Sequence, residues 1–303
     1  MRIVDRLIAT SLPAVPRPLV RHFADRYMAG ETLAQAMSAV AALNRIGAKA
    51  TVDVLGEDVD DPAQCQATAD QYVELLDAIA AARLDATVSI KLSALGAEID
   101  PSLVLGHARR VVAAAADHGN FVRIDMEHSG LIDQTLGVYR TLREEGHENV
   151  GIVLQAYLRR TFDDVRALAE LAPNVRLVKG IYIEPPELAY REPALINRNF
   201  VALLRELIDR GCPVAVATHD DALVGEAQRL ADERRLGPDR YEFQLLLGVK
   251  EHLRDRLIGS GERVRIYVPF GEAWYGYSVR RLKENPSIAG YVAKDVLGSV
   301  VRR

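Results

Sequence analysis

The sequence predicts an α/β fold of the (β/α)8 TIM-barrel type, and three observations support this prediction. The chain has 303 residues, and a barrel of this kind needs about 250. Short β-rich runs alternate along the chain with longer segments that have a helical pattern. The β-rich runs are almost continuously apolar, which is typical of parallel strands covered on both faces. Such runs lie at residues 50–54, 87–91, 121–125, 151–155, 175–179, 213–217, 241–245 and 264–267.

The residues before the first strand predict a helical extension. Segment 31–47, ETLAQAMSAVAALNRIG, is its clearest amphipathic piece. We expect residues 1–48 to form N-terminal helices that pack on the barrel. Neither a repeat nor a low-complexity linker interrupts the β/α alternation, so residues 1–303 are expected to form one barrel domain.

Helix starts and one long loop are also visible. Asp61 and Asp100 each precede a proline, which predicts an N-cap followed by proline at the first helical position. Thr161 is predicted to cap the helical segment FDDVRALAELA. Segment 180–194, GIYIEPPELAYREPA, follows the fifth strand, and its three prolines predict a stiff active-site loop.

Composition and charge exclude several classes of protein. Hydrophobic residues make up 49% of the chain and charged residues 26%, as in ordinary globular proteins. The net charge is −4 without long runs of one sign, so no nucleic-acid partner is expected. Cys65 and Cys212 form no CxxC motif and are expected to be reduced core thiols of a cytoplasmic protein. Pro13, Pro16 and Pro18 interrupt the first apolar stretch, so no signal peptide or transmembrane segment is expected.

Polar residues end nearly every predicted strand. In a barrel, the C-terminal ends of the strands carry the active site. The residues concerned are Asp53, Lys91, Asp125, Glu127, Gln155, Arg176, Lys179, Thr218, His219, Gln244 and Tyr267. The three cations Lys91, Arg176 and Lys179 indicate an anionic ligand or a cofactor with phosphates. No catalytic metal is expected, because the chain has neither a strand-end HxH pair nor an HExxH helix.

The C-terminal segment WYGYSVRRLKENP has a polar stripe at helical spacing. Tyr277, Arg280, Arg281 and Glu284 follow the spacing i, i+3, i+4 and i+7, so they share one helical face. A helix after the eighth strand is predicted to lie over the barrel mouth, where two guanidinium groups would clamp a carboxylate. The same spacing also fits a solvated outer face with an internal Arg280 to Glu284 pair.

Eight sequence runs carry a family resemblance. They are VSIKLSALG, IDMEH, VLQAYLRR, VRLVKGIYIEP, VATHDD, YEFQLLLG, RIYVPFG and YSVRRLKENP. In this order they resemble the proline dehydrogenase family in its stand-alone bacterial form. The resemblance implies an FAD enzyme that oxidises L-proline to Δ1-pyrroline-5-carboxylate and passes the electrons to a membrane quinone. Because no segment is expected to span the bilayer in which the quinone lies, we expect the protein to meet the inner face of the membrane peripherally or through a carrier. No second catalytic domain is expected in the sequence, so we also expect a separate pyrroline-5-carboxylate dehydrogenase downstream.

The resemblance implies roles for individual residues. Asp125 and Arg176 match catalytic residues of the family, and Asp125 is interpreted as orienting Tyr267. The matches that hold the proline carboxylate or close over its ring are Lys91, Arg280, Arg281, Tyr267, Tyr277, Leu246 and Glu284. The matches for flavin contacts are Met126, Gln155, Lys179, Gly180, Ile181, Thr218 and His219. Ile181 stands where the family more often has alanine, and no residue stands out as the base for the proline amine.

Three other functions remain open at this point. Another flavin barrel, such as an enzyme like methylenetetrahydrofolate reductase, would not need the Arg280 and Arg281 clamp. A barrel lyase or aldolase would use Lys91 or Lys179 as a Schiff-base amine and would be colourless. A non-catalytic metabolite or flavin binder would leave the polar strand ends without a chemical task.

Overall fold

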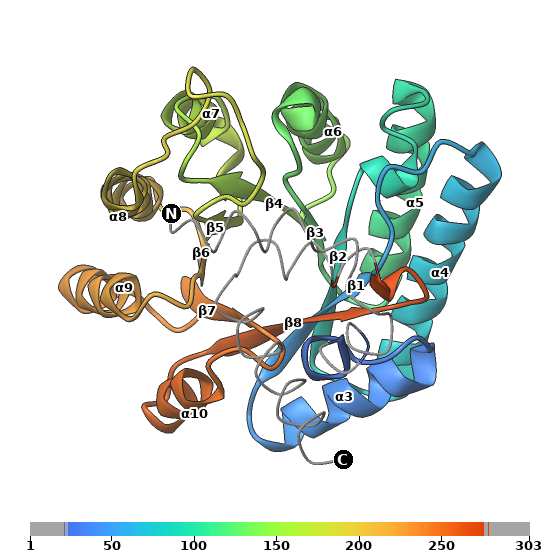
Figure 1. Ribbon diagram of the computed structural model, residues 1–303, viewed down its shortest axis with the longest axis horizontal. Coiled ribbons are helices and arrows are strands. Elements are labelled where there is room, and N and C mark those ends of the chain that lie inside the picture. The colour runs from blue at the N-terminus through green and yellow to red at the C-terminus, as the bar shows by residue number, and fades with distance from the viewer. Residues whose placement is uncertain (1–20, 22–23, 276–277, 279–303) are drawn as a thin grey trace, which may run out of the picture.

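Eight parallel strands close into a barrel in chain order, as the sequence predicts (Figure 1). The structure is a computed structural model that describes residues 21, 24–275 and 278. The strands are β1 (Lys49–Val54), β2 (Ala86–Ile90), β3 (Val122–Ile124), β4 (Val150–Gln155), β5 (Val175–Val178), β6 (Val214–Ala217), β7 (Tyr241–Leu246) and β8 (Val264–Phe270). β8 pairs with β1 in parallel and closes the ring.

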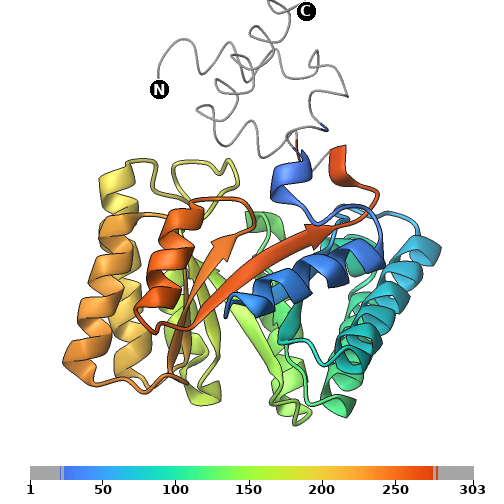
Figure 2. The same cartoon turned by 90° about the horizontal axis from the view of Figure 1, so that it is seen from below.

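Helices follow the strands and surround the barrel (Figures 1 and 2). Those after β1 to β7 are α4 (Pro62–Ala81), α5 (Pro101–Asp117), α6 (Ile132–Glu144), α7 (Thr161–Ala167), α8 (Pro193–Asp209), α9 (Asp221–Arg234) and α10 (Glu251–Gly259). Short 3-10 turns are η2 (Ser93–Leu95), η3 (Ser129–Leu131) and η4 (Ala169–Leu171). The expected C-terminal helix over the barrel mouth lies outside the described residues.

The predicted N-terminal helix packs on the barrel. Helix α3 (Leu33–Arg45) begins after Thr32, whose side chain forms a capping box with Gln35. Its buried residues Ala36, Val40 and Leu43 are at helical spacing, and the helix contacts β1 and β8. This confirms the amphipathic segment, while residues 1–20 lie outside the description.

Two of the three predicted helix caps are confirmed. The Asp100 side chain accepts hydrogen bonds from the backbone of Ser102 and Leu103, and Asp61 caps α4 in the same way. The prediction for Thr161 is wrong, because this residue is the first of α7 and its side chain does not cap the helix. Its hydroxyl instead donates to the carbonyl of Gln155 at 2.6 Å. Thr161 therefore ties the start of α7 to the end of β4.

Removing the Asp61 cap should destabilise the fold by a measurable amount. Asp61→Ala leaves the backbone N–H of Ala63, now bonded at 2.9 Å, without its acceptor. We expect the free energy of unfolding to fall by about 1 kcal/mol in chemical denaturation. Asp60→Ala, at the exposed position before the cap, is the control and should change it by less than about 0.5 kcal/mol. Equal effects of the two variants would contradict the capping role.

The interior of the barrel is more polar than is usual for this fold. Branched apolar side chains fill most such barrels. Here the strands contribute buried Thr51, Asp53, Ser89, Arg123, Gln155, Arg176 and Gln244. The barrel contains two cavities, which we call the strand-end cavity and the strand-start cavity after the strand termini that surround them. Cys65 and Cys212 are buried free thiols outside these cavities.

Candidate active site

The strand-end cavity collects every predicted site residue that the structure describes. Its volume is about 460 Å³, within the range of ligand cavities, about 300–1,000 Å³. The predicted residues that line it are Lys91, Asp125, Met126, Gln155, Arg176, Lys179, Gly180, Ile181, Thr218, His219, Leu246 and Tyr267. The remaining predicted residues, Tyr277, Arg280, Arg281 and Glu284, lie outside the described part of the chain. These residues lie on or directly after seven of the strands, β2 to β8, so the barrel brings distant sequence runs to one site.

Asp125 joins Arg176 to Tyr267 in the floor of this cavity. Arg176 Nη1 lies 2.7 Å from Asp125 Oδ1, and the Tyr267 hydroxyl donates to Asp125 Oδ2 at 3.0 Å. The Ser89 hydroxyl also donates to Asp125, at 2.7 Å. The Arg176 guanidinium lies 5.3 Å from the centre of the Tyr267 ring, as in a cation–π contact. The carboxylate therefore fixes both a cation and an aromatic ring, including the Tyr267 contact that the sequence predicts.

Lys91 is held by Asp53 next to this group, with its Nζ 3.9 Å from Asp125 Oδ2. Its Nζ lies 2.7 Å from each carboxylate oxygen of Asp53, which is fully buried at the end of β1. Lys91 also donates to the Tyr267 hydroxyl at 3.2 Å. Burial lowers the pKa of Lys91, but the charges of Asp53, Asp125 and Glu57 outweigh it and leave the pKa above its ordinary value. Lys91 is therefore a cation at neutral pH.

The sequence places Asp53 at a strand end but does not show that it forms an ion pair with Lys91. Asp53 belongs to the polar ring at the strand ends, but its role there follows only from the register of β1 and β2, in which it lies opposite Ser89. The Tyr72 hydroxyl, from α4, lies 3.3 Å from Asp53 Oδ1 and donates to the Ser89 carbonyl at 2.7 Å. A side chain on an outer helix thus reaches through the barrel wall and fixes Asp53.

The far side of the cavity is built by the ends of β5, β6 and β7. Lys179 forms an ion pair of 2.8 Å with Asp220, which also caps α9. The backbone N–H of Leu246 donates to Nε2 of His219 at 3.0 Å. This nitrogen is therefore an acceptor, which assigns the ring proton to Nδ1. The contact fixes the ring orientation of His219.

The loop after β5 approaches the cavity through Gly180. This residue has a φ of 106°, in a region that favours glycine. A Cβ here would overlap the ring of Tyr157. Further along the loop, Glu184 accepts hydrogen bonds from Ser129 N at 2.7 Å and Ser129 Oγ at 2.6 Å. The predicted loop therefore lines the site and is anchored to the neighbouring loop.

Gln155 offers a test of whether a ring cofactor fits. Its Nε2 donates to the carbonyls of Met126 and Glu127 at 3.1 and 3.3 Å. Its Oε1 is buried and has no hydrogen-bond partner among the residues that the structure describes. A buried acceptor of this kind is costly unless a donor reaches it. The lactam N–H of a flavin ring is such a donor, so the site fits a flavin.

A cluster of candidate metal ligands lies beside this site. Donor atoms of Asp58, Glu98 and His128 lie within 4.8 Å of one another, and both carboxylates are exposed. The residues that line the strand-end cavity do not include these three. The cluster therefore adds nothing to the chemistry of the cavity.

Comparison with known proteins gives the family. A sequence profile described as proline dehydrogenase matches residues 36–294. The chain belongs to the proline dehydrogenase family. It is 40% identical over 280 residues to a proline dehydrogenase of Deinococcus radiodurans, covering 91% of this chain and 90% of that protein. It is 36% identical over 274 residues to proline dehydrogenase 1 of Bacillus subtilis strain 168, covering 90% of each.

Solved structures share the barrel of this proline dehydrogenase family member. Proline utilization A of Bdellovibrio bacteriovorus, in a crystal structure inactivated by N-propargylglycine, matches with a TM-score of 0.81 and 26% identity. The match covers 88% of this chain and 33% of the larger protein. Proline utilization A of Bradyrhizobium japonicum shares the fold with a TM-score of 0.72 at 23% identity, over 85% of this chain and 30% of that one. The chain therefore spans about a third of these solved proteins.

Proposed function

We propose that this protein is an FAD-dependent proline dehydrogenase that oxidises L-proline to Δ1-pyrroline-5-carboxylate, the first step of proline catabolism, with a quinone as electron acceptor. Membership of the family supports the reaction. The observation that carries the assignment is the gathering of every described predicted site residue around one cavity.

Lys91 supplies fixed positive charge for the substrate carboxylate. Its charge is maintained by Asp53, so the cation does not depend on the substrate for its protonation. Arg280 and Arg281 complete the proposed clamp, with Glu284 holding the pair and Tyr277 and Leu246 beside the ring. Forked guanidinium groups bind a carboxylate with defined geometry. Binding by the carboxylate then orients the ring carbon next to nitrogen.

The other wall of the cavity is assigned to the flavin. When bound, FAD supplies the hydride acceptor. Arg176 places a buried positive charge where a reduced ring would carry negative charge. Gln155 Oε1, which is buried without a partner among the described residues, would accept a hydrogen bond from the ring, and Gly180 would allow the backbone to approach it. The remaining proposed flavin contacts are Met126, Lys179, Ile181, Thr218 and His219.

The proposal also covers the electron acceptor, the cellular location and the enzyme that uses the product. Among residues 21, 24–275 and 278 there is no helix with the length and apolarity needed to cross a membrane. We propose a cytoplasmic protein of one domain, residues 1–303, that meets a membrane quinone peripherally at the inner face. We also propose that a separate pyrroline-5-carboxylate dehydrogenase consumes the product.

The Schiff-base alternative is disfavoured by the state of Lys91. A lysine nucleophile must be a neutral amine, and enzymes lower its pKa to obtain one. The carboxylates around Lys91 raise its pKa instead. Lys179 is ion-paired with Asp220 at 2.8 Å. Neither amine is placed for covalent catalysis.

The proposal is tested by identifying cofactor and product together. The purified protein should be yellow, and denaturation should release FAD in near-equal amount to the chain. With L-proline and a soluble quinone analogue it should form Δ1-pyrroline-5-carboxylate, which is measured by chromatography. A colourless protein, or one that forms a covalent adduct with substrate on reduction by borohydride, would overturn the assignment.

Tyr267 should select proline over 4-hydroxyproline. Its hydroxyl is fixed between Lys91 and Asp125, and we place its ring over the substrate. An added substrate hydroxyl would clash or remain unpaired, which costs about 1–3 kcal/mol. Proline should be preferred about ten- to a hundredfold in kcat/KM.

Two variants separate the ring of Tyr267 from its hydroxyl. Tyr267→Ser should narrow the preference, chiefly by weakening turnover of proline. Tyr267→Phe keeps the bulk and should retain the preference while turning proline over more slowly. A serine variant that keeps the full preference would show that Tyr267 is not the selector.

A further inference from the structure

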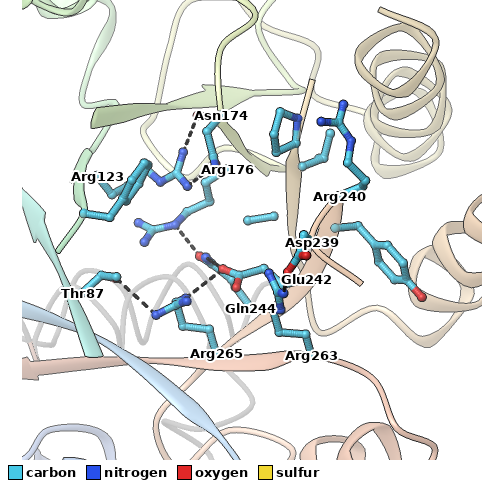
Figure 3. Close-up of a pocket in the computed structure, with 15 residues that line it drawn as sticks. Thr87, Arg123, Asn174, Arg176, Asp239, Arg240, Glu242, Gln244, Arg263 and Arg265 are labelled. Atoms are coloured by element: carbon cyan, nitrogen blue, oxygen red, sulfur yellow. Dashed lines mark hydrogen bonds and ion pairs between the residues drawn. The ribbon is translucent and has the colours of Figure 1, made fainter. Parts of the chain in front are cut away.

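The strand-start cavity lies at the other end of the barrel (Figure 3). Its volume is about 130 Å³, several times the share of one water molecule in the liquid, about 30 Å³. The cavity exists because small residues occupy positions that bulky side chains usually fill. Ala215 on β6 lines the cavity between Arg176 on β5 and Glu242 on β7. Gly151 on β4 lies opposite Arg123, and a Cβ there would overlap the Arg123 guanidinium, so this glycine makes room for the arginine side chain.

Positive charge dominates the wall of this cavity. Its charged residues are Arg123, Arg176, Arg240, Arg263, Arg265, Asp239 and Glu242. Figure 3 shows Arg123 and Arg176 on one side of the space and Glu242 and Arg265 on the other, with Arg240 further out. Five cations thus face two carboxylates, which is an unfavourable balance for a partly enclosed site.

Most of these arginines have a carboxylate partner. Arg265 Nε lies 2.9 Å from Glu242, and Arg263 pairs with Asp239. Arg176 Nη1 lies 2.7 Å from Asp125, on the side of the strand-end cavity. Within the described part of the chain, Arg123 and Arg240 have no carboxylate oxygen at ion-pair distance.

Arg123 is the unusual member because it is buried. Only 4% of its surface is exposed. Its hydrogen bonds go to Ile152 O at 3.1 Å, Asn174 O at 2.5 Å and Asn174 Oδ1 at 2.6 Å, all of them neutral oxygens. Burial and the repulsion of Arg176 and Arg265 lower its pKa to about 9, although the charges of Glu242 and Asp125 act in the opposite direction. At neutral pH the group is therefore still a cation, without an anion in contact.

We propose that the strand-start cavity binds a small oxyanion of the phosphate class, with Arg123 as its principal anchor. Guanidinium groups donate paired, charge-assisted hydrogen bonds to such anions. Arg265 and Arg176 add positive charge from neighbouring walls. The site is separate from the proposed active site, although Arg176 and Gln244 line both cavities. The inference does not depend on the reaction that the strand-end cavity performs.

Inorganic phosphate is the probe for this site. Equilibrium dialysis of the purified full chain against labelled phosphate, with chloride holding the ionic strength constant, should give saturable binding of about one anion per chain. Arg123→Gln should weaken this binding about tenfold or more, because it removes a charge-assisted contact. Ala215→Val keeps every arginine but fills the cavity, and it should weaken binding to a similar degree.

A cation at the other end of the barrel provides the control. Lys179→Met removes a positive charge from the strand-end cavity and should leave phosphate binding unchanged. Loss of binding in this variant, with binding retained in Arg123→Gln and Ala215→Val, would place the anion in the strand-end cavity and overturn the proposal. Absence of saturable binding to the unmodified protein would overturn it as well.

Discussion

Replacing Asp53 by asparagine should lower the free energy of unfolding by about 3–5 kcal/mol, because it removes the closest partner of a buried charge and leaves only Asp125 and Glu57, at 3.9 and 4.0 Å from Lys91 Nζ. Lys91 Nζ now lies 2.7 Å from both carboxylate oxygens of Asp53. The pair is enclosed, with Asp53 fully buried and Lys91 8% exposed. Chemical denaturation of the purified variant, followed by far-UV circular dichroism, measures the loss.

The controls for Asp53 use a second lysine pair and a double variant. Lys49 pairs with Asp85 in an exposed setting, so Asp85→Asn should cost no more than about 1 kcal/mol. Adding Lys91→Met to Asp53→Asn removes the unpaired cation and should recover part of the lost stability. A double variant less stable than Asp53→Asn alone would contradict the view that the unpaired Lys91 charge causes the damage.

Gly180→Ala should reduce both stability and flavin retention. Alanine at a φ of 106° is strained, and its Cβ would overlap the buried ring of Tyr157. We expect the free energy of unfolding to fall by about 1–3 kcal/mol. The ratio of flavin to protein after gel filtration should fall as well, because the loop that lines the cavity must shift.

Gly146 provides a matched control for this substitution. It also has a positive φ, 91°, but a Cβ there would meet no atom within 4 Å. Gly146→Ala therefore adds the backbone strain without the steric overlap and should retain a normal flavin content. A flavin content that falls equally in both variants would show that the close approach to Tyr157 is not what matters.

The barrel could be predicted because its strands are apolar almost throughout. The predicted strands differ from the observed ones at their ends, because hydrogen-bond pairing with neighbouring segments, rather than apolar composition, decides at which residue a strand ends. The sequence predicts that the eighth strand ends at Tyr267, whereas β8 continues to Phe270. It runs to Phe270 because neighbouring chain segments use the carbonyls there: Ala29 N donates to Pro269 O and Leu55 N donates to Phe270 O, each at 2.8 Å.

The site could be predicted as a set of residues but not as a network. Sequence runs and barrel topology place Lys91, Asp125 and Tyr267 at the same end of the barrel. They do not show that Asp53 neutralises Lys91, because this depends on the register of β1 with β2. The wrong cap at Thr161 has a similar origin, since a tertiary contact with Gln155 uses its hydroxyl.

Two arginines that line the strand-start cavity are visible in the sequence, but the sequence alone gives them no function. Arg123 and Arg265 are charged residues inside short apolar strands. A charge at such a position must be buried with a partner or lie on an open edge. Only the closed barrel shows that Arg123 and Arg265 face a common cavity.

The most direct test of the proposed reaction is anaerobic mixing of the purified protein with L-proline. Without oxygen or quinone, electrons taken from proline must remain on the enzyme. We predict that the flavin absorbance of the protein is bleached by L-proline and returns when a quinone analogue is added. A protein that contains flavin and keeps its full absorbance at saturating L-proline would contradict the account.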